Sequence, residues 1–156
     1  MSFDCNASLA AGALLVYHSP SMDNLTLEQR VRTMRAVRDR DTTPELVVRR
    51  LASALGHRYQ LHARRLPGCP DLVFGSQKKV IFVHGCFWHG HTCRSGIKRP
   101  KSNAEYWTNK LLKNKLRDSA NRVRLRALGW KALTIWECQL RRIDLVERRI
   151  ERFLDG

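Results

Sequence analysis

The sequence predicts a mixed α/β domain, and three observations predict it. The chain has 156 residues, of which 43% are hydrophobic, a size and composition that suit one compact domain with a hydrophobic core. Helical and strand-like apolar periodicities alternate along it. The run KVIFVH, residues 79–84, is apolar and β-branched, as is typical of a strand buried on both faces of a sheet.

The N-terminal part predicts one well-marked helix. Residues 25–37 form a basic helix candidate that residues 39–43 interrupt. A second helix is expected to begin near Thr43, because Pro44 suits the first helical position and an acidic residue follows in the first turn. Gly56 is expected to end it.

Strands are predicted next. Residues 57–62 form one candidate, and the loop LPGCPD leads into a second, DLVF, at Asp71. This second strand lies close enough in sequence to residues 79–84 to pair with them as a hairpin.

The C-terminal part predicts a long helix, a strand and a last helix. Residues 102–105 fit a capping box that opens the long helix, and Gly129 ends it. Residues 130–136 (WKALTIW) are expected to form a strand, and residues 143–153 an amphipathic helix. The expected inner stripe of the long helix is Leu112, Leu116, Ala120, Val123 and Ala127.

The charge of the chain indicates a polyanionic partner. Lys and Arg number 29 against 14 Asp and Glu, a formal net charge of +15. Soluble surfaces usually mix both signs, so this excess favours nucleic-acid binding over a merely solvated surface.

The N-terminus has an apolar run, LAAGALLVY, at residues 9–17. It lacks a preceding basic segment and is too short to cross a bilayer. We therefore expect residues 1–21 to be a disordered extension or a misassigned start, and residues 22–156 to form the single functional domain. No membrane association is expected.

The stretch HGCFWHGHTC, residues 84–93, is rich in metal ligands. Structural zinc takes four Cys or His ligands. The chain offers five candidates for four positions: Cys86, His89, His91, Cys93 and the more distant Cys138. Free buried thiols with surface histidines are the alternative.

Three further residues suggest phosphodiester chemistry. Asp71 begins one predicted strand and His84 ends the next, and Glu45 in the first turn of a helix could reach the same place. A carboxylate on a strand can hold Mg²⁺, and a nearby His can move a proton. Each also has an ordinary structural explanation as a turn, strand-end or helix-dipole residue.

Aromatic and polar residues could contact DNA bases. Phe87 and Trp88 lie inside the metal-ligand stretch, where exposed rings could unstack a base step or simply pack in the core. Trp107, Lys110 and Asn114 share one helical face by their spacing, and Lys and Asn can bond base edges.

Several ordered motifs resemble one family. LPGCPDLVF, VIFVHGCFWHGHTC and GWKALTIWEC, with MRAVRDRDTTPE upstream and EYWTNKLLKNKLRD on the long helix, resemble the very short patch repair (Vsr) DNA mismatch endonucleases over residues 22–153. The resemblance implies a restriction-endonuclease-like αβββαβ core. It also implies Mg²⁺-dependent nicking of duplex DNA 5′ of the thymine in T:G mismatches, which arise from 5-methylcytosine deamination.

The resemblance also implies roles for single residues. Asp71 and the Val83 main-chain carbonyl would bind Mg²⁺, His84 and Glu45 would hold metal-bound or attacking water, and His89 would transfer a proton. Four residues would bind structural zinc: Cys86, His91, Cys93 and Cys138. Six residues would wedge into or read the mismatch: Phe87, Trp88, Trp107, Lys110, Asn114 and Met34.

The pattern departs from that of common restriction enzymes in one place. No Glu-x-Lys follows Asp71, and Val83-His84 stand there instead. A restriction-like endonuclease with another DNA target, or a non-catalytic zinc-dependent DNA-binding module, are the alternative functions. The resemblance further implies a monomer in the cytoplasm, associated with the nucleoid and linked to a cytosine-5 DNA methyltransferase and mismatch-repair proteins.

Overall fold

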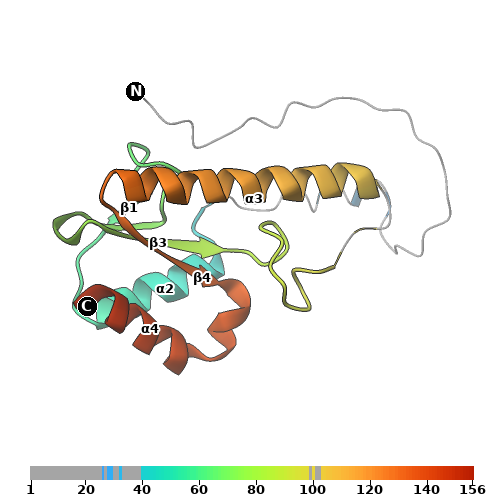
Figure 1. Ribbon diagram of the computed structural model, residues 1–156. Coiled ribbons are helices and arrows are strands. Elements are labelled where there is room, and N and C mark those ends of the chain that lie inside the picture. Colours follow the sequence, from blue (N-terminus) through green and yellow to red (C-terminus); the bar gives the residue numbers. More distant parts are fainter. Residues whose placement is uncertain (1–25, 27, 30–31, 33–39, 99, 101–102) are drawn as a thin grey trace.

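One four-stranded sheet lies between α3 on one face and α2 and α4 on the other (Figure 1). The computed structural model describes residues 26, 28–29, 32, 40–98, 100 and 103–156. The elements are α2 (Thr43–Ala54), β1 (Gln60–Leu61), β2 (Leu72–Phe74), β3 (Lys79–His84), α3 (Ala104–Ala127), β4 (Lys131–Trp136) and α4 (Ile143–Asp155), with 3-10 turns at Gly75–Gln77 and Glu137–Arg141. From α2 to β4 this is the αβββαβ order, which confirms the predicted mixed α/β core.

The sheet has the order β1-β2-β3-β4. β1, β2 and β3 pair antiparallel, so β2 and β3 form the predicted hairpin. β4 pairs parallel with β3 along its whole length, from Lys79 opposite Lys131 to His84 opposite Trp136. Parallel neighbours need a crossover connection, and α3 supplies it. The carboxyl ends of β3 and β4 therefore lie side by side.

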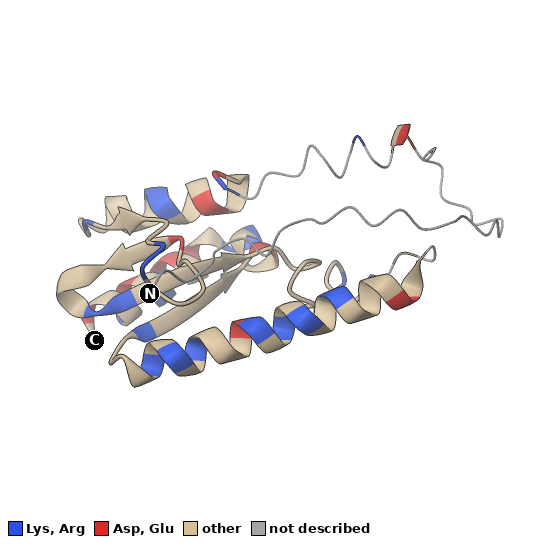
Figure 2. Ribbon diagram, turned by 90° about the horizontal axis from the view of Figure 1, so that it is seen from above, with Lys and Arg blue, Asp and Glu red and all other residues tan. Residues whose placement is uncertain are grey.

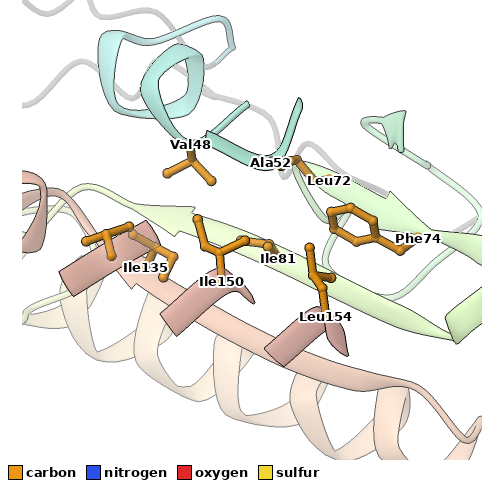
Figure 3. Close-up of a cluster of buried hydrophobic side chains, with 9 residues drawn as sticks. Val48, Ala52, Leu72, Phe74, Ile81, Ile135, Ile150 and Leu154 are labelled. Atoms are coloured by element: carbon orange, nitrogen blue, oxygen red, sulfur yellow. The ribbon is translucent and has the colours of Figure 1, made fainter. Parts of the chain in front are cut away.

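Apolar side chains cover both faces of the sheet, which explains why β2 and β3 are apolar without alternation. On one face, residues from α2, β2, β3, β4 and α4 form the larger cluster (Figure 3): Val48, Ala52, Leu72, Phe74, Ile81, Ile135, Val146, Ile150 and Leu154. On the other face a smaller cluster includes Leu125 of α3: Leu66, Val73, Val80, Phe82 and Leu125.

The boundaries of α2 agree with the sequence prediction, whereas those of β1 do not. α2 begins at Thr43 with Pro44 in its first turn, as predicted, and Gly56 follows it with a φ of +79°. β1 is shorter than the predicted strand at residues 57–62. The N–H of His57 still bonds the carbonyl of Ala52, and His62 has a φ of +47°, so extended pairing is confined to the two residues between them.

The expected inner stripe of α3 is wrong. Leu112, Leu116 and Val123 are 53–62% exposed. The less exposed side of the helix is another one: Leu111, Asn114, Asp118, Asn121 and Leu125. α3 begins at Ala104, after Asn103 in a left-handed conformation without a side-chain cap bond, and Ser102 of the predicted capping box lies outside the described residues.

Some predictions fall on residues that the structure does not describe. The extension at residues 1–21, most of the helix candidate at residues 25–37, and Met34 lie outside the described residues. Within the described part of the chain, no helix has the length and apolarity needed to cross a membrane.

Candidate active site and metal centre

A cavity of about 470 Å³ opens where the ends of β2 and β3 meet α2 and α3. β2, β3 and their flanks contribute Asp71, Val83 and His84 to its lining, α2 contributes Glu45, and α3 contributes Asp118. Five arginines also line it: Arg40, Arg64, Arg117, Arg122 and Arg124. This many guanidinium groups around carboxylates suit the cavity to a phosphate-bearing ligand.

Asp71 lies at the start of β2, where antiparallel pairing brings it against the end of β3. Its Oδ2 accepts the backbone N–H of Val83 at 2.7 Å. Burial raises the pKa of Asp71 to about 7, while the Val83 bond opposes the rise and the nearby Glu45 carboxylate adds to it. A buried carboxylate beside a second one suits divalent-cation binding, because a cation removes the cost of ionising it.

His84 and His89 stack face to face beside Asp71. Their ring centroids are 3.7 Å apart with an interplanar angle of 9°. His89 Nδ1 lies 2.5 Å from Oδ2 of Asp118 on α3. Burial, with His89 adjacent, lowers the pKa of His84 to about 3, so His84 is neutral at physiological pH. The Asp118 carboxylate stabilises a positive charge on His89, which makes His89 the ring suited to accept a proton.

Four side chains gather just beyond the end of β3, with ligand atoms within 4.8 Å of one another: Cys86, His91, Cys93 and Cys138. Cys138 follows β4, so the parallel pairing of β3 and β4 brings it to the loop. Its N–H bonds the Cys86 Sγ at 3.4 Å, and its Sγ lies 3.5 Å from His91 Nδ1. His89 is outside this group, as the resemblance implied.

The chemistry of this group fits structural zinc. Three thiols and one imidazole are a common tetrahedral donor set for Zn²⁺. Burial raises the pKa of Cys86 to about 12, whereas the hydrogen bond from His91 lowers that of Cys93 to about 6. A cation that binds thiolates would offset the free-energy cost of packing these four side chains together.

Aromatic rings cluster between the metal-ligand loop and the start of α3. Phe87 contacts Trp88 and Trp107, with ring centroids 5.1 and 5.4 Å apart. Lys110 Nζ lies 5.5–5.8 Å from the rings of Tyr106, Trp88 and Trp107. The Asn114 side chain donates to the carbonyl of Trp88 at 2.8 Å, which ties the loop to the helix.

Comparison with known proteins agrees with this geometry. Residues 22–95 match the family model described as DNA mismatch endonuclease Vsr. The chain is 44% identical over 133 residues to the Type II nicking enzyme V.XorIIP of Xanthomonas oryzae, covering 85% of this chain and 97% of that protein. It is 42% identical over 112 residues to the DNA mismatch endonuclease Vsr of Escherichia coli, covering 72% of this chain and 71% of that protein.

The chain belongs to the Vsr family. It is therefore a DNA endonuclease, a hydrolase acting on phosphodiester bonds. Among solved structures, the catalytic domain of homing endonuclease I-Bth0305I is similar, with a TM-score of 0.49, 24% identity, and coverage of 72% of this chain and 94% of that one.

In this Vsr-family endonuclease, the structure brings together nearly all of the predicted site residues. The cavity joins Asp71, Val83, His84, His89 and Glu45. The cysteine and histidine group and the aromatic cluster with Lys110 and Asn114 contain all the other predicted residues except Met34, which lies outside the described residues.

Sequence reasoning missed Asp118 and the pair formed by Arg49 and His62. Asp118 lies four residues after Asn114, on the same helical face, and this spacing is the signal that could have found it. Arg49 lies four residues after Glu45 in the same way, and its Nη2 is 2.9 Å from a Glu45 oxygen. His62 gives no comparable signal, because its contacts depend on a left-handed turn.

Proposed function

We propose that this Vsr-family endonuclease nicks duplex DNA on the 5′ side of the thymine in a T:G mismatch. The observation that carries the proposal is the aromatic cluster with Lys110 at one side of the catalytic cavity. Rings that enter a base stack discriminate a mismatch, since a mismatched pair costs less to unstack than a normal one. The Escherichia coli relative is named as a DNA mismatch endonuclease, which supports the same target.

The residues of the cavity divide the chemistry among them. Asp71 and the carbonyl of Val83 would hold Mg²⁺, which when bound supplies positive charge to the scissile phosphate. Glu45 and neutral His84 hold the attacking water. Its oxygen bonds phosphorus as the bond from phosphorus to O3′ breaks, His89 takes the proton of the water, and O3′ takes one from solvent. Asp118 stabilises the imidazolium that results.

Zinc has a structural role in this proposal. Cys86, His91, Cys93 and Cys138 would hold it, fixing the loop that carries both His89 and the aromatic pair Phe87 and Trp88. Lys110 and Asn114 would meet the T:G pair beside Trp107. The enzyme would act as a monomer on an asymmetric nick, in cells that also contain a cytosine-5 DNA methyltransferase.

The test uses a labelled duplex with T:G in a CT(A/T)GG-like context, beside an otherwise identical T:A duplex, with Mg²⁺. We expect one nick in the T strand of the mismatched duplex and none in the control. Equal cutting of both duplexes would overturn the mismatch specificity and favour a restriction-like endonuclease with another target. Asp71→Ala should abolish nicking. Asp144 is an exposed acidic residue of α4, and Asp144→Ala should leave nicking unchanged.

A further inference from the structure

Arg49 of α2 joins two residues of the catalytic cavity through one guanidinium group. The residue is 8% exposed. Its Nη2 lies 2.9 Å from Glu45 Oε2 and 2.9 Å from His62 Nε2, and its Nη1 lies 2.6 Å from Asp41 Oδ1. Glu45 and His62 both line the cavity.

These contacts hold Glu45 in a fixed position. Glu45 is 4% exposed, its Oε1 accepts the Thr42 hydroxyl at 2.8 Å, and its Oε2 accepts the Asp41 N–H at 3.1 Å as well as Arg49. A carboxylate offers about four acceptor positions. Three are filled, so one is left toward the cavity for a water.

The same guanidinium determines which nitrogen of His62 carries the proton. Arginine only donates hydrogen bonds, so Nε2 of His62 must accept. The distance from Nε2 to Asp41 Oδ1, 3.9 Å, is too long for a competing hydrogen bond in which Nε2 donates. In this contact Nε2 accepts, which assigns the ring proton of His62 to Nδ1.

The backbone places this ring beside the catalytic carboxylate. Pairing of Gln60 with Val73 and of Leu61 with Leu72 continues to His62 opposite Asp71, where the His62 N–H meets the Asp71 carbonyl at 3.5 Å. His62 has a φ of +47°, which is unfavourable for a residue with a side chain. Strain of this kind persists where surrounding contacts fix it, commonly at functional sites.

We propose that His62 is a substrate-binding residue that donates its Nδ1–H to a phosphate oxygen of the cut strand, and that Arg49 is the positioning residue that fixes this tautomer and Glu45. Five arginines line the cavity in which a phosphate would bind, but an arginine presents a mobile charge on a long stem. A short imidazole fixed by Arg49 gives one directed hydrogen bond next to Asp71.

The first test is spectroscopic and needs no DNA. In the full chain with ¹⁵N-labelled histidine, long-range ¹H–¹⁵N spectra report which ring nitrogen is protonated, and His62→Asn identifies the His62 signal by removing it. We expect the proton on Nδ1, and a shift toward the Nε2–H form in Arg49→Met. A wild-type His62 protonated on Nε2, or one unchanged in Arg49→Met, would overturn the proposal.

The second test compares two substitutions that both tolerate a left-handed φ. Asn carries an N–H donor near the position of Nδ1, whereas Gly carries none. With the duplex that the wild type cuts, we expect His62→Gly to lower kcat/KM about tenfold relative to His62→Asn, at matched melting temperatures, since one hydrogen bond contributes roughly that factor. Equal losses in the two variants would contradict substrate binding by His62.

The activity test rests on the proposed nicking reaction, and the spectroscopic test does not. A chain that cuts no mismatched duplex but shows the Nδ1–H form of His62 would contradict the proposed function alone. A chain that cuts the mismatch but shows the Nε2–H form would contradict only the role of Arg49 and His62.

Discussion

At the residue scale, the burial of Asp71 affects the metal binding proposed for this residue. Burial raises its pKa to about 7, so the carboxyl group is largely neutral below that pH and ionised above it. A carboxyl group must lose its proton to bind a cation. If Asp71 binds a divalent cation as proposed, protons would compete with that cation over the range in which most carboxylates are already ionised.

This competition predicts a pH-dependent metal requirement. The Mg²⁺ concentration that gives half-maximal nicking should fall as pH rises from 6 to 8, by about tenfold per pH unit below the pKa and by less above it. Titrating Mg²⁺ at several pH values, with constant ionic strength, measures it. A midpoint that does not move between pH 6 and 8 would show that Asp71 is already ionised without metal.

In the proposed mechanism, Asp118 acts on the reaction through His89. Its pKa is lowered although burial raises it, because the hydrogen bond and charge of His89 outweigh the burial. Asp118→Asn keeps the shape of the side chain but removes the charge that stabilises a protonated His89. We expect kcat to fall by about 10²-fold or more with little change in DNA binding, measured by single-turnover nicking and by binding of an uncut duplex. An unchanged kcat in Asp118→Asn would contradict proton transfer by a His89 that Asp118 stabilises.

At the element scale, the side of α3 that faces the sheet is not its apolar stripe. The side with Asn114, Asp118 and Asn121 lines or borders the cavity, while Leu112 and Leu116 are exposed. Helical periodicity alone favours the apolar stripe as the inner one. The periodicity was misleading here because the inward face carries polar residues that serve the site.

The reversed face of α3 predicts unequal costs for two leucine substitutions. Leu125 is fully buried under the sheet and Leu116 is 62% exposed. Leu125→Ala should lower the free energy of unfolding by about 2–5 kcal/mol, and Leu116→Ala by less than about 0.5 kcal/mol. Chemical denaturation of the two variants measures these losses. A larger loss of unfolding free energy in Leu116→Ala than in Leu125→Ala would support the inner stripe predicted from sequence.

The loop after β3 predicts different roles for two histidines that are two residues apart. His91 belongs to the cysteine and histidine group, whereas His89 pairs with Asp118. We expect His91→Ala and Cys138→Ser to lose bound zinc and to melt at lower temperature, by about 3 °C for each kcal/mol lost. His89→Ala should keep zinc and stability but lose nicking. Zinc content by elemental analysis distinguishes these outcomes, and zinc retained in Cys138→Ser would contradict the ligand assignment.

At the scale of the whole molecule, α3 brings a series of basic side chains to the site. Lys and Arg recur along α3 (Figure 2), and three arginines of this helix line the cavity: Arg117, Arg122 and Arg124. α4 lies on the opposite face of the sheet (Figure 1). DNA bound along the cavity would thus contact α3 and leave α4 in solvent.

This arrangement predicts which cations control the salt dependence of DNA binding. The logarithm of the association constant should fall linearly with the logarithm of salt concentration. Arg122→Ala should reduce the slope by about 1, and Arg148→Ala on the exposed side of α4 should leave it unchanged. Fluorescence anisotropy with a duplex, at several KCl concentrations, measures both slopes. Equal effects of the two variants would show that the bound DNA does not follow the cavity.

The sequence predicted most of the fold, for reasons that particular segments make clear. The β-branched run of β3 can be buried on both faces, and Pro44 suits only the start of a helix, so both were correctly predicted. Local patterns carry such information. They do not carry the fold-dependent contact of His89 with Asp118, or that of Arg49 with His62, because each joins segments whose approach depends on the whole sheet.

The parallel pairing of β3 with β4 also bears on how the enzyme is made. Asp71, His84 and His89 are synthesised before the strand beside β3 and before Cys138, which follow them in the sequence. Since chains fold progressively during synthesis, the loop that carries His89 cannot pair with Cys138 until the chain beyond β4 has been made. Chains that end before β4 should therefore lack nicking activity.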